Sequence, residues 1–371
     1  MRSSYKEKDV ILLLKDITGM VDPQPAQERE RLIQSGRHYC EMLPLEYVPT
    51  EKYMQVYREA LEKYAGPVAC AVGRLSEKII EKRGTSAVLV SLARAGIPVG
   101  ILLKHFIEKY YHLQIPHYAI SIIRGRGIDH QAMKYLLQRY RPEQLLFVDG
   151  WIGKGAILGE LEKEMQQYPG VLPELAVVAD PAGVTELCGT HEDILIPSSC
   201  LNCTVSGLIS RTFLREDIIG KDDFHGAVYY GELSDADLSY DFIHAIEAHF
   251  EEGERGSRRL DGYTEADAGC VCLSAKEQED RTTKGFGVDE VKEIAEYFGI
   301  SDINLVKPGI GETTRVLLRR VPWRILIDDA YREDDELAHI RRLAAEKQVP
   351  VMYYPLKHYK CCGIIKRMAD T

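Results

Sequence analysis

The sequence of 371 residues predicts an α/β protein built on a parallel sheet. From residue 87 onward, short apolar runs without polar alternation are separated by helical patterns, which is typical of strands that helices cover on both faces. The composition, 45% hydrophobic and 28% charged, is that of a soluble globular protein. The length exceeds one ordinary core, so more than one domain is expected.

The expected elements alternate in order along the chain. They are strands at 87–92, 117–123, 143–149, 174–180 and 193–197, and helices at 97–111, 130–140, 155–165 and 184–188. Strands joined by such helices form a doubly wound sheet, in which ligands bind at the carboxyl ends of the strands.

Two further parts flank this core. Residues 1–85 contain a helical pattern at 53–64 and are interpreted as an N-terminal extension, before a core at 86–270. A strand at 226–230 and a helix at 237–250 follow within that core. A small α/β domain at 286–371 is predicted from helices at 288–300 and 334–348 and strands at 324–330 and 349–356.

The charge is uneven along the chain. Residues 305–371 carry 13 Lys and Arg against 9 Asp and Glu, a net +4, while the whole chain has a net charge of −10. The last segment is therefore a basic module on an acidic body, and only this module is expected to meet nucleic acid.

No apolar stretch is long enough to span a bilayer, and the charged first residues do not form a secretory signal. A cytoplasmic location with nine reduced cysteines is expected. Cys200 and Cys203 have a CxxC spacing, but no second pair with zinc-site spacing follows them. The pairs Cys270/Cys272 and Cys361/Cys362 do not supply one, so no metal ligand is predicted among the side chains.

Two glycine-containing turns, SLARAG at 91–96 and FVDGWIGKGA at 147–156, follow expected strands and open expected helices. Such a turn directs backbone N–H groups and the positive end of a helix toward an anion. Two of them at one edge of a sheet can hold one ligand at two places, although each could also be a tight turn without a ligand.

The segment LLFVDGWIGKGAI resembles the signature of type I phosphoribosyltransferases. The resemblance implies that Asp149 accepts hydrogen bonds from ribose hydroxyls of phosphoribosyl pyrophosphate, and that Mg²⁺ bridges its pyrophosphate oxygens. It implies that the 5-phosphate is held by the backbone of Ile152, Gly153, Lys154, Gly155 and Ala156. Gly150 stands where that family has a second acid, which favours a non-catalytic sensor as an alternative.

SLARAGIPVG is similar to the pyrophosphate loop of the same enzymes. Arg94 would then bind pyrophosphate with the amides of Ala95 and Gly96, unless it forms a structural ion pair. In SIIRGRGIDH, Arg124 and Arg126 would neutralise charge as pyrophosphate leaves, unless this is a solvated loop.

Hydroxyl and guanidinium groups cluster just after the expected strand at 193–197. Thr204, Ser206 and Arg211 could complete the pocket for the second substrate, although helix capping would explain Thr204 or Ser206 equally well.

A closer resemblance rests on four longer motifs, SGRHYCEMLPLE, PSSCLNCTVSGLISRT, KPGIGETTRVLLRR and YKCCGIIKRM. They are similar to phosphoribosyltransferase-like proteins of bacterial tellurite-resistance and stress gene clusters, a family also labelled cysteine protease StiP. That family carries a C-terminal domain similar to the RNA-binding domain of Pelota and L7Ae-type proteins. The residues implied for RNA binding are Lys307, Gly309, Gly311, Arg315, Lys357, Lys360, Lys366 and Arg367.

Three functions follow as hypotheses. The first is Mg²⁺-dependent phosphoribosyl transfer, or its reverse, coupled to RNA binding in a stress response. The second is a nucleotide or sugar-phosphate sensor that binds RNA, and the third is a thiol protease using Cys200 or Cys203 with His191 as base. A C-terminal domain that only docks or regulates, and a homodimer, are the remaining alternatives for partners.

Overall fold

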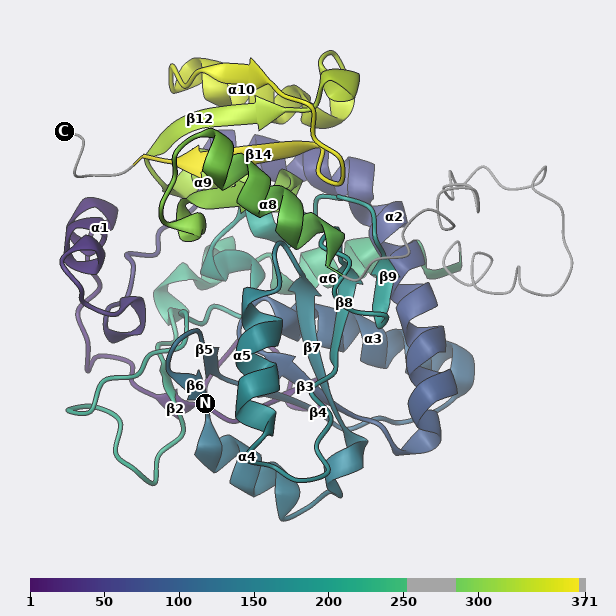
Figure 1. The fold of residues 1–371 in the computed structure, drawn as a ribbon. Coiled ribbons are helices and arrows are strands. Elements are labelled where there is room, and N and C mark those ends of the chain that lie inside the picture. Colours follow the sequence, from purple (N-terminus) through teal and green to yellow (C-terminus); the bar gives the residue numbers. More distant parts are fainter. Residues whose placement is uncertain (252–284, 367–371) are drawn as a thin grey trace, which may run out of the picture.

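The computed structural model describes residues 1–251 and 285–366. The calls on Cys270, Cys272 and Arg367, and the parts of the expected domains at 252–270 and 367–371, lie outside these residues. Figure 1 shows a large α/β core with a smaller α/β domain packed against one end of it. The expected α/β class is confirmed.

The core is a six-stranded sheet in the order β1-β4-β3-β7-β8-β9, and every neighbouring pair is parallel. Its strands are β1 (Ile11–Leu12), β3 (Val88–Leu92), β4 (His117–Ile120), β7 (Leu145–Trp151), β8 (Leu175–Ala179) and β9 (Cys188–Thr190). Two minor sheets pair β2 (Lys15–Asp16) with β10 (Gly226–Ala227) and β5 (Ile122–Ile123) with β6 (Gly127–Ile128).

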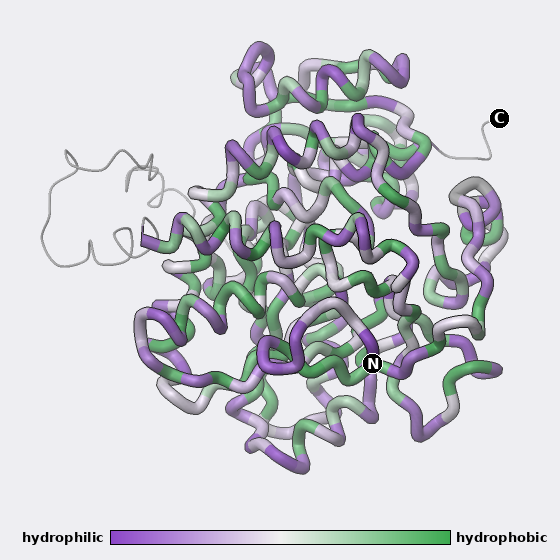
Figure 2. Tube along the Cα trace, turned by 180° about the vertical axis from the view of Figure 1, so that it is seen from behind, coloured by the Kyte–Doolittle hydropathy of each residue, from purple (hydrophilic) through white to green (hydrophobic). Residues whose placement is uncertain are grey.

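Helices cover both faces of this sheet. They are α2 (Glu51–Arg83), α3 (Gly96–Tyr111), α4 (His130–Leu137), α5 (Ala156–Met165) and α6 (Ser239–Glu247), whereas α1 (Ala26–Gln34) lies apart from the sheet (Figure 1). Alternate strand residues point to opposite sides. Leu146 and Val148 pack with α2, α3 and α6, whereas Leu145 and Phe147 pack with α4 and α5. Apolar segments accordingly gather in the interior, as Figure 2 shows.

The C-terminal domain has a four-stranded mixed sheet in the order β11-β14-β12-β13. Its elements are β11 (Val306–Pro308), β12 (Pro322–Ile327), β13 (Val351–Tyr353) and β14 (Cys361–Ile365), with helices α8 (Phe286–Tyr297), α9 (Ile310–Arg319) and α10 (Ala338–Glu346). α8 and α9 lie nearer the core than β12 and α10 (Figure 1).

Two expected elements are wrong, and one is longer than expected. Residues 184–187 form no helix, because the Asp180 carboxylate accepts the backbone N–H groups of Val184 and Thr185 and fixes a turn. Residues 193–197 form no strand. The helix expected at 53–64 extends to Arg83 and ends at Gly84, which has a φ of 58°. Residues 1–85, expected as an extension, thus supply the edge strand β1 and the longest helix of the core.

Candidate functional site

The two glycine-containing turns lie next to each other at one edge of the sheet. They follow β3 and β7, which are paired, and they lead into α3 and α5. A Cβ atom added to Gly96 would lie 2.3 Å from the carbonyl oxygen of Val148, so the two backbones are in direct contact. Both helix N-termini therefore face the same region, as the sequence predicted.

The loop 152–156 leaves three amides open at the start of α5, whereas the N–H group of Ile152, also predicted to bind phosphate, donates to the Ala179 carbonyl at 3.0 Å. Within the described part of the chain, the N–H groups of Gly153, Lys154 and Gly155 donate to no protein group. Gly155 has a φ of 78°, a left-handed conformation that glycine adopts without strain. These features suit an anion cradle.

The C-terminal domain covers this loop. The Tyr359 hydroxyl donates to the Gly153 carbonyl at 2.7 Å, and Lys154 Nζ donates to the carbonyls of Ile303 and Val306. Burial, followed by the charges of Lys307 and Arg124, lowers the pKa of Lys154 to about 8. Lys154 thus serves the contact between the domains.

Asp149 stands near the end of β7, beside the same loop. Burial raises its pKa to about 6, although the Gly150 N–H group, which donates to its Oδ1 at 2.7 Å, acts in the opposite direction. Arg315 of α9 also lowers the pKa of Asp149, which shows that the C-terminal domain reaches this carboxylate. At neutral pH the group is mostly ionised and can accept hydrogen bonds.

Arg94 forms an ion pair within the core. Its Nη1 lies 3.0 Å from the Glu46 carboxylate and donates to the Ile209 carbonyl at 2.7 Å, and its side chain is 12% exposed. Burial opposes the charge of Arg94, but Glu46 raises its pKa above the ordinary value. The ion pair weighed as an alternative for Arg94 is therefore present.

A narrow cavity, partly open to solvent, lies between the turns and α9. Arg315 lies over the Trp151 ring, 4.8 Å from its centroid. Two buried polar atoms here, Ser199 Oγ and Arg315 Nε, have no hydrogen-bond partner. The lining residues are Arg94, Ala95, Pro98, Trp151, Ser198, Ser199, Leu201, Asn202, Ser206, Arg315 and Arg319.

Several arginines gather at this cavity, although Arg94 pairs with Glu46 and Arg315 pairs with Glu312. Arg211 is an exposed residue. Desolvation of its guanidinium group lowers its pKa to about 9, and the charges of Arg94 and Arg315 act in the same direction. Desolvation lowers the pKa of Arg319 to about 10, and the charges of Arg315 and Arg94 act in the same direction. Guanidinium groups that repel one another in this way are stabilised by an anion placed among them.

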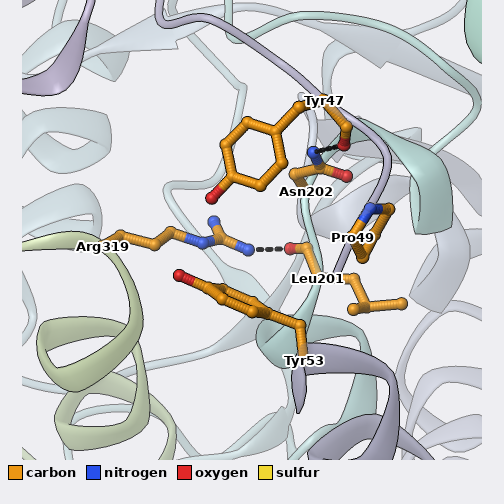
Figure 3. A pocket seen from close by; sticks show the side chains of 6 residues that line it. All are labelled: Tyr47, Pro49, Tyr53, Leu201, Asn202 and Arg319. Carbon is orange, nitrogen blue, oxygen red and sulfur yellow. Dashed lines mark hydrogen bonds between the residues drawn. The ribbon is translucent and has the colours of Figure 1, made fainter. Parts of the chain in front are cut away.

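A smaller cavity adjoins the first through Leu201, Asn202 and Arg319. Figure 3 shows the rings of Tyr47 and Tyr53 on either side of the Arg319 guanidinium, which donates to the Leu201 carbonyl. Asn202 Nδ2 donates to the Tyr47 carbonyl at 2.7 Å.

The other residues predicted for the core site are more scattered. Arg124 donates to Asn304 of the C-terminal domain at 2.8 Å, and Arg126 pairs with Glu41 at 2.9 Å. Thr204 is buried, and its N–H and hydroxyl both donate to Asn202 Oδ1, so Asn202 is the capping residue here and the capping alternative for Thr204 is wrong. Of the predicted core residues, only Arg94, Ala95 and Ser206 line the first cavity.

Most residues predicted for RNA binding face the core. Gly311 lies close to Trp151, Gly309 lies close to the Asp193 carboxylate, and Arg315 lines the cavity. Lys307 is largely enclosed, and burial lowers its pKa. Lys360 pairs with Glu336, at 2.6 Å.

The two remaining lysines lie elsewhere on the domain. Lys357 pairs with Glu293 on the surface, and the backbone N–H of Lys366 donates to Val321. The RNA role of the whole set stays a prediction.

The cysteines proposed as nucleophiles are buried. Burial raises the pKa of Cys200 to about 12, and it also raises that of Cys203. Within the described residues, the hydrogen bonds link neither thiol to a histidine. His191 contacts a different cysteine.

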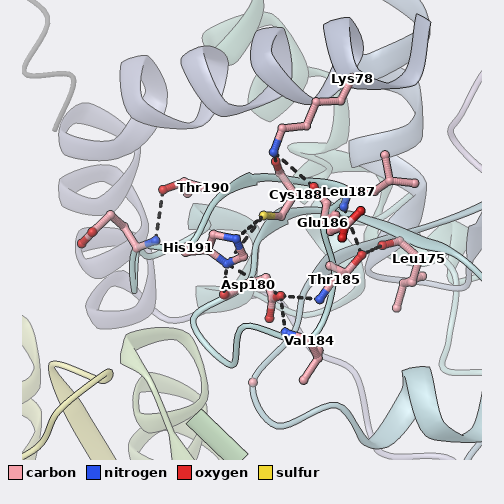
Figure 4. Close-up of polar contacts among 12 residues, drawn as sticks. Lys78, Leu175, Asp180, Val184, Thr185, Glu186, Leu187, Cys188, Thr190 and His191 are labelled. Carbon is pink, nitrogen blue, oxygen red and sulfur yellow. Dashed lines mark hydrogen bonds and ion pairs between the residues drawn. The ribbon is translucent and has the colours of Figure 1, made fainter. Parts of the chain in front are cut away.

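His191 lies beside Cys188, as Figure 4 shows. The Nε2 atom is 3.4 Å from Cys188 Sγ, and Nδ1 is 2.9 Å from the main-chain carbonyl of Asp180. The Asp180 carboxylate lies 3.8 Å from Nδ1. A thiol, an imidazole and a carboxylate thus meet at the ends of β8 and β9.

Several residues of the site were not predicted, namely Trp151, Ser199, Asn202, Arg319 and Cys188. Arg319 follows Arg315 by one helical turn, so helical spacing could have placed both on one face of α9. Nothing local in the sequence marks the others, because they meet only when separate loops pack together.

No helix in the described residues is long and apolar enough to cross a membrane. Among the same residues, no group of three or more His, Cys, Asp or Glu side chains could hold a metal ion.

Comparison with known proteins assigns both parts of the chain. A family model described as tellurite-like stress resistance cysteine protease StiP matches residues 3–247, and one described as PELOTA RNA binding domain matches residues 286–367. A protein of Acinetobacter baylyi named cysteine protease StiP is 33% identical over 377 residues, covering 98% of this chain and 94% of that protein.

Among solved structures, a hypoxanthine-guanine phosphoribosyltransferase from Bacillus anthracis is 14% identical. It covers 37% of this chain and 72% of that chain, with a TM-score of 0.22.

Proposed function

The chain belongs to the StiP family of tellurite-like stress resistance proteins, and from that premise we propose that its core transfers a phosphoribosyl group to or from a base. The observation that carries this proposal is the pair of contacting anion-binding turns beside a cavity lined with arginines. A ligand with phosphate at one end and pyrophosphate at the other matches this arrangement.

The role proposed for each residue follows from its position in the site. The open amides of Gly153, Lys154 and Gly155 would hold the 5-phosphate, and Asp149 would accept hydrogen bonds from the ribose hydroxyls. Arg315 and Arg319 would bind the pyrophosphate as fixed forks, beside the Arg94–Glu46 ion pair. Since the amides are covered by the C-terminal domain, the ligand would enter beside α9.

In the proposed step, the bond between C1 of the ribose and a pyrophosphate oxygen breaks and a bond from C1 to a base nitrogen forms. The oxygen keeps the electron pair, and the base nitrogen loses its proton to solvent. The guanidinium groups would stabilise the negative charge that develops on the leaving pyrophosphate.

Mg²⁺ would fit this site only in part. Asp149 is the carboxylate at the loop that is not already in an ion pair, since Glu312 pairs with Arg315 at 3.0 Å. Magnesium is commonly held by one or two carboxylates together with substrate phosphates, so Asp149 and the pyrophosphate would hold it. When bound, it would lower the charge of the leaving group.

The test is Asp149→Asn, assayed by pyrophosphate release from phosphoribosyl pyrophosphate with each common base, and by the reverse reaction. We expect turnover to fall by about 10²-fold or more, the usual loss when one group that stabilises the transition state is removed. Because the wild-type pKa is about 6, wild-type activity should rise as the pH increases through 6.

The matched control is Asp217→Asn, an exposed acid in a surface ion pair with Arg215. It should leave turnover unchanged. Full activity in Asp149→Asn would show that the assignment is wrong, and binding of the ligand without turnover in the wild type would indicate a sensor.

We further propose that the C-terminal domain binds RNA. The match of residues 286–367 to an RNA-binding domain supports this, together with the net positive charge of the segment. RNA binding would then connect the chemistry of the core to a nucleic-acid target in the stress response.

A second candidate, a thiol hydrolase, is favoured by the contact of Cys188 with His191 and by the name of the Acinetobacter relative. Nδ1 of His191 donates to the Asp180 carbonyl, and in that tautomer the unprotonated Nε2, 3.4 Å from Cys188 Sγ, would take the thiol proton. The thiolate would attack a peptide carbonyl, the amine would leave with that proton, and water would hydrolyse the thioester. Cys188 is 1% exposed, so substrate would reach it only after its neighbours move.

Cys188→Ser tests this candidate, with Cys203→Ser as a control at another buried thiol. On a casein or peptide-library substrate, the wild type should cleave, Cys188→Ser should lose cleavage and Cys203→Ser should keep it. Equal cleavage by the wild type and Cys188→Ser would remove Cys188 as the nucleophile.

A further inference from the structure

The C-terminal domain carries a cluster of aromatic side chains on its surface, made by the end of α8 and by β12 and the segment after β13. We call it the aromatic platform, and it consists of Tyr297, Phe298, Trp323, Arg324 and Tyr354. Tyr297 is 65% exposed and Trp323 is 37% exposed, which is unusual for side chains of this size. Neither ring contributes to a described core cluster.

The rings lie close together. The centroid of Tyr297 is 4.9 Å from that of Phe298 and 5.3 Å from that of Tyr354. Phe298 and Trp323 meet edge to face, at 6.2 Å and 87°. Such contacts hold the rings in place and leave faces open to a flat ligand.

Arg324 joins two of these rings. Its guanidinium carbon lies 4.2 Å from the centroid of Trp323 and 5.1 Å from that of Phe298. Its Nε atom is buried without a hydrogen-bond partner, and in the described residues no carboxylate pairs with it. Glu293, an acid close to Tyr354, is already neutralised by Lys357 at 2.7 Å. The platform therefore offers a positive charge among aromatic faces.

The residues that the sequence assigned to RNA are mostly turned toward the core. Arg315 and Gly311 contact Trp151 of the core, and Asp193 of the core accepts the Ile310 N–H group at the start of α9. RNA that binds the domain in its docked position must therefore use another face. β12, which carries Trp323 and Arg324, lies farther from the core than α9 (Figure 1).

We propose that the aromatic platform binds single-stranded RNA by stacking unpaired bases on Tyr297 and Trp323, with Arg324 meeting the phosphate backbone or a base face. Exposed rings with an interleaved arginine are the usual means of holding single-stranded nucleic acid. This inference rests on the RNA-binding part of the proposed function and assigns its surface.

The test uses the full chain and a fluorescein-labelled, 20-nucleotide single-stranded RNA of mixed sequence, followed by fluorescence anisotropy. Trp323→Ala, Tyr297→Ala and Arg324→Gln should each weaken binding at least tenfold, within the range expected for losing one base stack. Trp323→Phe keeps a ring and should restore most of the affinity. Lys292→Gln removes one exposed positive charge from α8 and should change binding less than threefold.

The outcomes separate the two claims. If the wild type binds no RNA, both the RNA-binding proposal and the platform are wrong. If the wild type binds and the platform variants bind equally well, only the platform is wrong. Loss of binding in Arg315→Gln alone would show that RNA uses the face that docks on the core.

Discussion

At the scale of single residues, Gly96 decides whether the two anion-binding turns can touch. A Cβ at this position would lie 2.3 Å from the Val148 carbonyl oxygen and 3.0 Å from Asp149 Cα, and both contacts are with backbone that cannot rotate away. We expect Gly96→Ala to destabilise the protein by about 1–3 kcal/mol, as overpacking usually does. The midpoint of urea denaturation, followed by circular dichroism, measures this.

Gly159→Ala is the matched control, because no atom lies within 4 Å of the added Cβ in the middle of α5. Alanine favours a helix over glycine by about 1 kcal/mol, so this variant should be slightly stabilised. A Gly96→Ala variant as stable as Gly159→Ala would mean that the turns are not in contact.

Sequence reasoning identified the site residues that belong to local motifs. Arg94, Ala95 and Ser206 each follow an apolar run, and they do line the cavity. Trp151 and Asn202 also line it, but their role depends on packing between loops that are distant in sequence. No spacing rule reports such packing.

At the scale of elements, the predicted order of strands and helices is correct from β3 to β8, apart from the short pair β5 and β6. The prediction of elements is wrong where a side chain competes with regular backbone hydrogen bonds. Asp180 accepts two backbone N–H groups at 2.7 and 2.8 Å, so the apolar pattern at 184–188 forms a turn and then enters β9. A short apolar run alone cannot tell these alternatives apart.

The opposite error occurs in α2. The expected helix at 53–64 is too short, because the structure continues the helix through Gly66 and Pro67 for 33 residues in all. Val68, Val72, Leu75 and Ile79 keep one apolar face buried against the sheet and α3. Tertiary burial thus outweighs the local cost of glycine and proline.

At the scale of the whole molecule, the C-terminal domain completes the core site. Arg315 and Arg319 reach the cavity from α9, Tyr53 of α2 donates to the Leu318 carbonyl at 2.5 Å, and Tyr359 donates to Gly153. The sequence predicted both parts and the basic charge of the second. Their docking was not predicted, since contacts between distant segments leave no periodic pattern.

Asp193 should hold this arrangement together. Its Oδ1 accepts the Ile310 N–H at 2.9 Å and its Oδ2 accepts the Lys360 N–H at 3.0 Å, so one core carboxylate binds two elements of the other domain. Asp193→Ala leaves both amides without an acceptor, at a cost of about 1–3 kcal/mol for each. We expect amide hydrogen exchange at Ile310 and Lys360 to accelerate about tenfold or more, with Ala330 unchanged as an internal control, since Asp328 of the same domain accepts its N–H.

The same carboxylate makes docking depend on pH. Burial raises the pKa of Asp193 to about 6, so the docked state binds a proton more tightly than the undocked state. The contribution of Asp193 to the stability of the docked state is therefore complete below the ordinary carboxyl pKa, and it is lost as the pH rises through 6. After correction for intrinsic rates, exchange at Ile310 and Lys360 should be faster at pH 8 than at pH 5 in the wild type. Asp193→Asn should lose that difference, and an Asn variant that keeps it would show that another group controls docking.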